Sequence, residues 1–438
     1  MEVFIKILQF FASLSLLVAI HEFGHFIAAR IFRIRVEKFY IFFNPWFSLF
    51  KFNFRGTEYG MGWVPLGGYV KIAGMIDESL DTEQMKQPAK PDEFRARPAW
   101  QRLIVMVAGV VMNLVLAFCI YCGISYKWGT TYLANEDVKW GYVFNDAAHD
   151  MGFADGDKII SIDGEVIDNS NDILTMMIMA EADREVVIER DGETETLLIP
   201  FEKLLDMRTN ERYTDFYAPR MPMCVGEVVS GTAAEAGLME GDIITGVNGE
   251  HSFAAADIFD LIQNRKGEVV TLDIERGGEE LQIEAPVNDE GKVGFIVASL
   301  PLRTQKYTFW QSIPAGARLT GKVVSNYWQQ LKMIVKPKTE MYKNLGGFIA
   351  IGNIFPSQWD WRQFWYLTGF FSIILAIMNI LPIPGLDGGH SLFALWEIIT
   401  GRKPGDRFLE IAQYIGMAFL LLLLLYANGN DIYRFFIK

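Results

Sequence analysis

The chain has 438 residues, of which 51% are hydrophobic and 21% charged, and its formal net charge is −13. This length exceeds one ordinary domain, and the composition excludes both a purely membrane-embedded bundle and an average cytosolic enzyme. The negative charge argues against nucleic-acid binding.

Four segments are long and apolar enough to cross a bilayer, whose hydrocarbon core takes about 20 helical residues. They lie at about 4–32, 103–125, 364–381 and 411–427. The first contains Lys6 and is followed by no small-residue cleavage site, so we expect it to be retained rather than removed as a signal peptide. The sequence therefore predicts a multi-pass α-helical membrane protein with four transmembrane helices.

Lysine and arginine near the ends of these spans set the predicted orientation, because loops rich in them stay on the cytoplasmic side. The first loop contains Arg30, Arg33, Arg35, Lys38, Arg95, Arg97 and Arg102, and the third contains Arg402, Lys403 and Arg407. We expect these two loops to face the cytoplasm. The long acidic segment between the second and third spans is then expected outside, together with both termini.

The first span contains a motif with metal-binding chemistry, His21-Glu22-Phe23-Gly24-His25. Residues four apart in an α-helix are about 6 Å apart along the axis and about 40° apart around it, so both imidazoles can reach one zinc ion. Glu22 beside them can take a proton from water. Unpaired, these groups would carry a desolvation cost on the order of several kcal/mol, which a metal removes. The alternative is a packed histidine pair near the membrane interface.

Residues 39–74 are rich in aromatic side chains and alternate apolar with polar or small residues, which is typical of β-strands. The aromatic content favours strands that dip partly into the membrane interface. A strand edge there could pair with a substrate segment, exposing one carbonyl while satisfying the released backbone groups. The alternative is a peripheral hairpin that only covers the site.

An internal repeat organises the acidic segment. Residues 145–165 match residues 230–250 at an offset of 85, and residues 186–194 are echoed by residues 272–280. Each copy predicts short strands, a helix and glycine turns. The shared pattern of alanines and glycines before a Gly-Asp pair resembles PDZ domains, which bind extended peptides at a sheet edge. The alternative is a pair of inert spacer domains.

Residues 309–335 form an amphipathic pattern that is too polar for a comfortable span. We expect a helix on the outer membrane surface, where it could couple the repeats to the membrane-spanning part.

A zinc site of this type needs a third protein ligand and an open position for water. After the third span the chain reads NILPIPGLDGGH (379–390), where Pro382 and Pro384 break the helix. An ionisable residue at such a break, near membrane depth, is a functional-site candidate. Asp387 is therefore the expected third ligand, and His390 is the alternative.

These features together resemble the site-2 protease family of intramembrane zinc metalloproteases. The resemblance rests on HEFGH in the first span, NILPIPGLDGG after the third and the tandem PDZ repeats between them, and it covers essentially the whole chain. It implies that His21, His25 and Asp387 bind Zn2+ and that Glu22 is the catalytic base.

The resemblance also implies residues that contact the substrate. Asn379 opens the family's N-x-x-P-x-P-x-L-D-G pattern and is expected to contact the substrate strand or the developing oxyanion. Gly60 and Gly62 match a G-x-G element of a membrane-associated β-hairpin whose edge clamps the substrate. Asn344 belongs to a substrate-facing segment.

Two positions depart from the family pattern. Val110 stands where the family has a proline in the second span, and Phe348 stands where it has a proline after N-L-x-G. We expect the helix around Asn113 and the segment after Asn344 to differ locally for this reason. Neither departure touches the expected metal ligands or the base.

The expected fold is thus four transmembrane helices with a membrane-associated β-hairpin element plus two tandem α+β PDZ domains. Residues 1–127 form the N-terminal catalytic half, 128–215 the first PDZ domain, 216–302 the second, 303–362 the amphipathic helix with the substrate-facing segment, and 363–438 the C-terminal half.

The implied function is hydrolysis of a peptide bond within the transmembrane segment of a single-pass membrane protein. The expected substrate is an anti-sigma factor already shortened by a site-1 protease, in envelope stress signalling, and peptide ends are expected to bind the PDZ domains. The expected location is the bacterial inner membrane, with the PDZ domains and termini periplasmic and the active site towards the cytoplasm. Two alternatives remain: a membrane-anchored PDZ scaffold with a structural metal, and an HExxH protease acting on soluble or misfolded segments.

Overall fold

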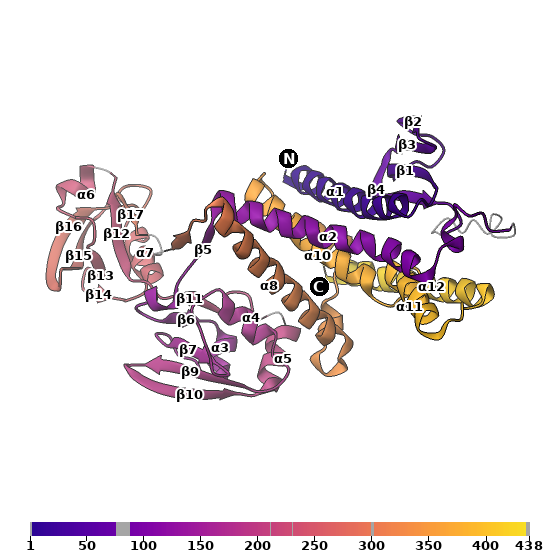
Figure 1. Cartoon of the computed structure of the whole chain (residues 1–438). Helices are drawn as coiled ribbons and strands as arrows, with labels where there is room; N and C mark the ends of the chain where they lie inside the picture. The colour runs from indigo at the N-terminus through magenta and orange to yellow at the C-terminus, as the bar shows by residue number, and fades with distance from the viewer. Residues whose placement is uncertain (1, 76–87, 211, 230, 299–301, 435–438) are drawn as a thin grey trace. The chain divides into compact units, whose positions relative to one another are not determined.

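The computed structural model describes residues 2–75, 88–210, 212–229, 231–298 and 302–434 (Figure 1). The chain divides into two compact units, one formed by residues 1–130 and 306–438 and the other by residues 131–305. The second unit is therefore an insertion between the two halves of the first.

Helices make up most of the first unit. They are α1 (Glu2–Ile31), α2 (Ala99–Trp128), α8 (Phe309–Val335), α9 (Phe348–Ile354), α10 (Trp361–Ile380), α11 (Asp387–Thr400) and α12 (Asp406–Ile432). Four of them, α1, α2, α10 and α12, are long and apolar enough to cross a membrane. These four overlap the four spans predicted from hydropathy, because only a helix satisfies every backbone group of a lone apolar segment in lipid.

Helix α2 is the centre of this unit, because α1, α8, α10 and α11 all pack against it (Figure 1). Glycines allow the close approaches. A Cβ atom on Gly369 of α10 would lie 2.9 Å from the ring of Tyr121, and one on Gly316 of α8 would lie 2.5 Å from Sγ of Cys122. Helix α8 occupies the residues predicted for the amphipathic helix, and it buries its apolar face against α2 and α10.

A four-stranded sheet follows α1. Its strands are β1 (Val36–Phe43), β2 (Phe50–Phe54), β3 (Thr57–Met61) and β4 (Val64–Ile72), in the order β2-β3-β1-β4. Strand β1 pairs with β3 in parallel and with β4 in antiparallel orientation, so the element is larger than the hairpin expected from the sequence. Within the described residues, β2 and β4 are the two edges. The phenylalanines of β2 are all exposed, which suits an apolar surrounding.

The second unit contains two sheet regions with nearly the same element order. The first has β6 (Tyr142–Phe144), α3 (Asp146–Met151), β7 (Lys158–Ile162), β8 (Glu165–Val166), α4 (Asp172–Ile178), β9 (Arg184–Arg190), β10 (Glu193–Ile199), α5 (Phe201–Thr209) and β11 (Tyr217–Pro219). The second has β12 (Met223–Val228), α6 (Gly231–Glu235), β13 (Ile243–Val247), β14 (Glu250–His251), α7 (Ala255–Gln263), β15 (Val269–Arg276), β16 (Glu279–Pro286) and β17 (Phe295–Val297). Strands β5 (Thr130–Tyr132) and β18 (Arg303–Gln305) pair where the chain enters and leaves.

One ion pair between an arginine and a buried aspartate occurs in both regions. Arg190 donates to both carboxylate oxygens of Asp157, and Arg276 donates to both of Asp242, with all four distances 2.7 Å. Both aspartates are buried, and each arginine also donates to a glycine carbonyl in the turn after α3 or α6. Burial alone would raise the pKa of Asp242, but the hydrogen bonds from Arg276, the backbone N–H of Met239 and the charge of Arg276 together outweigh it and hold that pKa below its ordinary value.

Candidate active site

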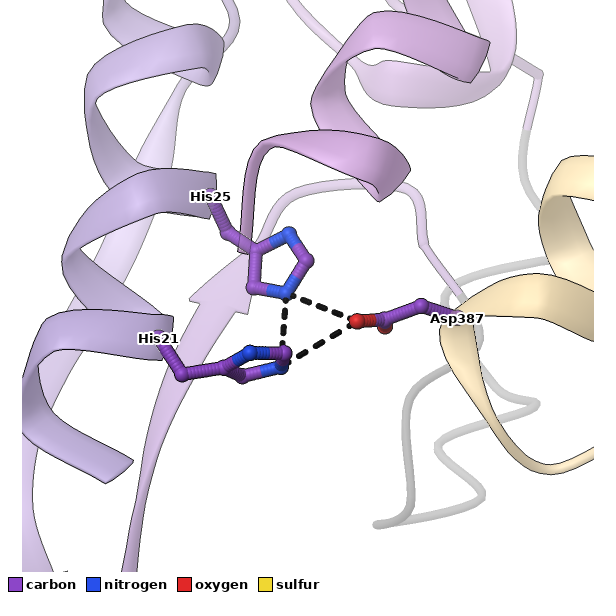
Figure 2. Close-up of side chains that lie close together, drawn as sticks. All are labelled: His21, His25 and Asp387. Atoms are coloured by element: carbon purple, nitrogen blue, oxygen red, sulfur yellow. Dashed lines mark hydrogen bonds and ion pairs between the residues drawn. The ribbon is translucent and has the colours of Figure 1, made fainter. Parts of the chain in front are cut away.

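Helix α1 carries the HEFGH motif on its buried side. No proline interrupts the helix, so His21 and His25 keep their one-turn spacing. Their side chains are buried, with His21 7% and His25 5% exposed. Figure 2 shows both rings pointing towards Asp387, which comes from a different part of the chain.

Asp387 reaches this place from a break between two helices. Two prolines stop the chain from continuing α10, and Asp387 is the first residue of α11. The turn is tight, because a Cβ atom on Gly388 would lie 2.1 Å from the carbonyl oxygen of Leu381. Further along α11, Glu397 forms an ion pair with Arg102 of α2, with 2.6 Å between Oε2 and Nη2. This contact fixes α11, and with it Asp387, against α2.

Three donor atoms form a nearly equilateral triangle (Figure 2). His21 Nε2 and His25 Nε2 are 3.2 Å apart, and Asp387 Oδ2 lies 3.1 Å from the first and 3.2 Å from the second. A tetrahedral zinc ion with bonds of about 2.0–2.1 Å separates its ligands by about 3.3 Å. Asp387 Oδ2 accepts no hydrogen bond from the described residues. The triangle therefore has the size and the electron-pair donors for three of four zinc ligands.

Helix α2 lies behind the two rings and contacts both. His25 Nδ1 donates to the carbonyl oxygen of Val105 at 2.8 Å, and the side-chain amide of Asn113 lies 3.2 Å from His21 Nδ1. Between them, a Cβ atom on Gly109 would lie 2.5 Å from His25 Nε2, so only glycine leaves room for the rings. Sequence reasoning assigned no role at the site to these three residues of α2.

Two further polar groups border the triangle. Glu22 Oε2 accepts the backbone N–H of Val70 at 3.0 Å, which brings the carboxylate to the outer edge of β4. Asn379, near the end of α10, places its side-chain Nδ2 3.4 Å from His21 Nε2. A carboxylate, an amide and a strand edge thus surround the three donor atoms.

The remaining candidates from the sequence lie elsewhere. Gly60 is on β3, which is paired on both sides, and Gly62 follows that strand with its Cα packed against the backbone of Phe43. Within the described residues, His390 is not part of the donor cluster and instead lines a cavity of about 80 Å³ with Arg102 and other residues. Asn344 is the last residue of the turn η5 (Met341–Asn344), and its side chain lies outside the described part of the structure.

The sequence is similar to a known peptidase family and to several named proteases. The chain matches the model of peptidase family M50 over residues 9–423. The "Putative zinc metalloprotease" of Xylella fastidiosa is 27% identical, with 98% of this chain and 99% of the relative covered. The "Regulator of sigma E protease" of Haemophilus influenzae is 29% identical, and the "Regulator of sigma-E protease RseP" of Salmonella typhimurium is 28% identical. Each of these two comparisons covers 97% of this chain and 98% of the relative.

The matched residues include both the HEFGH helix and the break at Asp387, which are far apart in sequence and meet only in the folded chain. The donor atoms that meet there have the spacing that zinc requires. The chain therefore belongs to peptidase family M50, the site-2 proteases, and is a zinc metalloprotease.

Proposed function

We propose that this protein hydrolyses a peptide bond inside the transmembrane segment of a single-pass membrane protein. In this proposal His21, His25 and Asp387 hold the zinc ion, and Glu22 is the general base. The observation that carries the proposal is the donor triangle, 3.1–3.2 Å on a side, with its two histidines on a helix apolar enough to cross a membrane.

The proposed roles follow from the chemistry of peptide hydrolysis. A zinc ion supplies Lewis acidity that activates water near neutral pH and polarises the scissile carbonyl. Glu22 takes the proton from the attacking water and returns it to the nitrogen of the leaving amine. Asn379 donates from Nδ2 to the carbonyl oxygen as negative charge develops there. Its distance of 3.4 Å from His21 Nε2 supports this role.

The substrate backbone is proposed to add to the open edge of β4. The peptide bonds of a membrane helix are shielded by their own hydrogen bonds, so cleavage needs an unwound segment whose backbone groups find other partners. Strand β4 is a sheet edge, and its Val70 N–H contacts Glu22. A strand added there would lie beside the base. Gly60 and Gly62 would act indirectly, by letting β3 and its turn pack tightly against β1.

Residues 128–215 and 216–302, which contain the two sheet regions of the second unit, are proposed to be PDZ domains that select substrates by their peptide ends. Their common element order and their common Asp–Arg pair support a duplicated module. Among the described residues, strand β17 ends the order of its sheet, and an extended peptide could add at that edge.

The proposed setting is the inner membrane of a bacterium, with the PDZ domains and termini periplasmic and the active site towards the cytoplasm. The basic residues of the first and third loops support this orientation. The proposed substrate is an anti-sigma factor that a site-1 protease has already shortened. Similarity to proteins named regulators of sigma-E protease supports this choice.

The test is cleavage of a tagged single-pass membrane protein, with its outer domain removed, by the purified wild type and by Glu22→Gln. The substitution keeps the size of the side chain but removes its basicity, so we expect at least about a thousandfold loss of cleavage with unchanged zinc content. The wild-type cut should map within the substrate's membrane segment by mass spectrometry and should stop when a chelator removes zinc.

Other outcomes would support different functions. Equal cleavage by both forms would refute Glu22 as the base. A cut mapped outside the membrane segment would support a protease for soluble or misfolded segments. Substrate retention without cleavage by either form would support a membrane-anchored scaffold with a structural metal.

A further inference from the structure

The face of α2 behind the zinc site contains a buried polar side chain, Asn113. We propose that Asn113 is a positioning residue for zinc: its Oδ1 accepts the Nδ1–H of His21 and so keeps the Nε2 lone pair directed at the metal. This inference rests on the proposed function of His21 as a ligand. Because it concerns how the His21 ring is oriented, an experiment can refute the role of Asn113 without refuting His21 as a ligand.

The Asn113 side chain is buried and lacks a partner for one of its two polar atoms among the described residues. Its side chain is completely buried, and its amide lies 3.2 Å from His21 Nδ1. With Nδ2 facing the ring, Oδ1 is buried without a partner among the described residues. The oxygen and nitrogen of an asparagine amide are assigned from their surroundings, and exchanging the two places the oxygen beside His21 Nδ1, the one partner that the amide has among the described residues. The buried oxygen then accepts a hydrogen bond from the Nδ1–H of His21.

The position of the ring proton decides whether His21 Nε2 can bind a metal. If Nδ2 donated to Nδ1, the ring proton would sit on Nε2, the atom that lies 3.1 Å from Asp387 Oδ2 and 3.2 Å from His25 Nε2. A protonated Nε2 cannot bind a cation. With Oδ1 as acceptor, the proton is held on Nδ1 and the Nε2 lone pair is available. The orientation in which Asn113 Oδ1 accepts from His21 Nδ1–H is thus the orientation that permits metal binding.

The neighbouring ligand has the same arrangement. His25 Nδ1 donates to the carbonyl oxygen of Val105, two turns earlier on α2. Gly109, midway between, has no side chain to hold the rings away. The backbone of α2 at Asn113 is held by Ser372 of α10, whose Oγ donates to the Asn113 carbonyl oxygen at 2.7 Å. One face of α2 therefore orients both imidazoles, one through a backbone acceptor and one through a side chain.

Acceptors of this kind matter for metal affinity. Removing the partner of a metal-bound histidine generally weakens metal binding about 10- to 100-fold. Only the Asn113 contact can be removed by a side-chain substitution, because the partner of His25 is a main-chain carbonyl. Asn113 is thus the position at which this effect can be measured.

The experiment measures zinc affinity of the full-length protein in detergent by competition with a chromophoric chelator. Asn113→Ala removes the acceptor, and we expect zinc binding about 10- to 100-fold weaker than in the wild type. Asn113→Asp keeps an oxygen of the same size and position, and we expect affinity within about threefold of the wild type or tighter. Val111→Ala, on the exposed side of the same helix, is the control and should not change affinity.

Comparing Asn113→Ala with Asn113→Asp shows whether Asn113 orients His21 or only fills space. A residue that only fills space would tolerate the small alanine better than a buried carboxylate, so zinc retention in Asn113→Ala and its loss in Asn113→Asp would overturn the inference. Equal affinity of Asn113→Ala and the wild type would also overturn it. If the wild type and His21→Ala bind zinc equally well, the proposed ligand set itself fails. Unfolding midpoints in excess chelator identify any variant that is destabilised independently of zinc.

Discussion

Substituting Gly24 by alanine tests whether close packing of α1 on α2 sets the geometry of the zinc site. A Cβ atom on Gly24 would lie 2.4 Å from the carbonyl oxygen of Ala108 and 2.9 Å from Cγ of Met112. The nearer atom belongs to the backbone of α2, so it cannot rotate away. Restoring an ordinary contact of about 3.4 Å requires the two helices to separate by about 1 Å, which generally costs about 1–3 kcal/mol of stability.

This separation acts on the donor triangle directly. The two histidines move with α1, whereas Asp387 stays with α2 through the packing of α11. Metal–ligand distances tolerate only about 0.2 Å of deviation, so a 1 Å displacement, about five times larger, should open the site. We expect zinc retention to fall sharply and kcat/KM to fall at least about 100-fold.

The assay is zinc content after dialysis against a graded chelator series, followed by cleavage of the tagged membrane substrate. Gly123→Ala, in α2, is the matched control because no atom lies within 4 Å of its added Cβ. It should retain zinc and gain up to about 1 kcal/mol of stability from higher helix propensity. A Gly24→Ala protein that keeps its zinc and cleaves like the wild type would refute the reasoning.

Two further substitutions test other parts of the structure. Asn379→Ala should lower kcat about 100- to 1000-fold with unchanged zinc content, because it removes the proposed donor to the developing oxyanion; steady-state cleavage with metal analysis measures both. Asp242 has a folded-state pKa below its ordinary 3.8, so the stability from its Arg276 contact is present above about pH 4 and is lost as the pH falls through the folded-state pKa. Asp242→Asn should lower the urea midpoint of this region at pH 7 and flatten its decline between pH 4 and pH 3, as followed by circular dichroism; a parallel decline in both proteins would contradict this assignment.

The helices were the most predictable part of the fold. Long apolar runs identify spans by length and composition alone, and four such helices occur where hydropathy placed them. The amphipathic pattern gave α8 from Phe309 to Val335. Its neighbours were less predictable, because amphipathicity locates an apolar face without naming what covers it. That face packs on α2 and α10.

The strand pairing of the sheet after α1 could not be predicted from its sequence. Alternation of side chains predicts strands but not their partners. The expectation of a hairpin came instead from the family resemblance at Gly60 and Gly62. In the observed sheet, β3 pairs with β1 in parallel on one side and with β2 in antiparallel orientation on the other. This order leaves Gly60 in the interior and β4 at the edge.

At the site, sequence spacing brought His21 and His25 together, and the helix break singled out Asp387. The contacts behind them gave no such signal. Val105 acts through its main-chain carbonyl, which any residue has, and Gly109 acts by lacking a side chain. Both come from a helix about 80 residues further along the chain, so only the folded structure brings them to the motif.

The hydrogen bond between Glu22 and Val70 joins the proposed general base to the strand on which we propose that the substrate adds. An edge strand offers its outward N–H groups to whatever chain pairs with it, and here one of those groups already binds a carboxylate oxygen of Glu22. A peptide that adds to β4 at this position must take that N–H and release the carboxylate. Before substrate binds, the Glu22 carboxylate would then stay hydrogen-bonded to β4, and pairing of a substrate strand would release it to act as the base. Peptide hydrolysis would then begin only after the substrate strand has paired with β4.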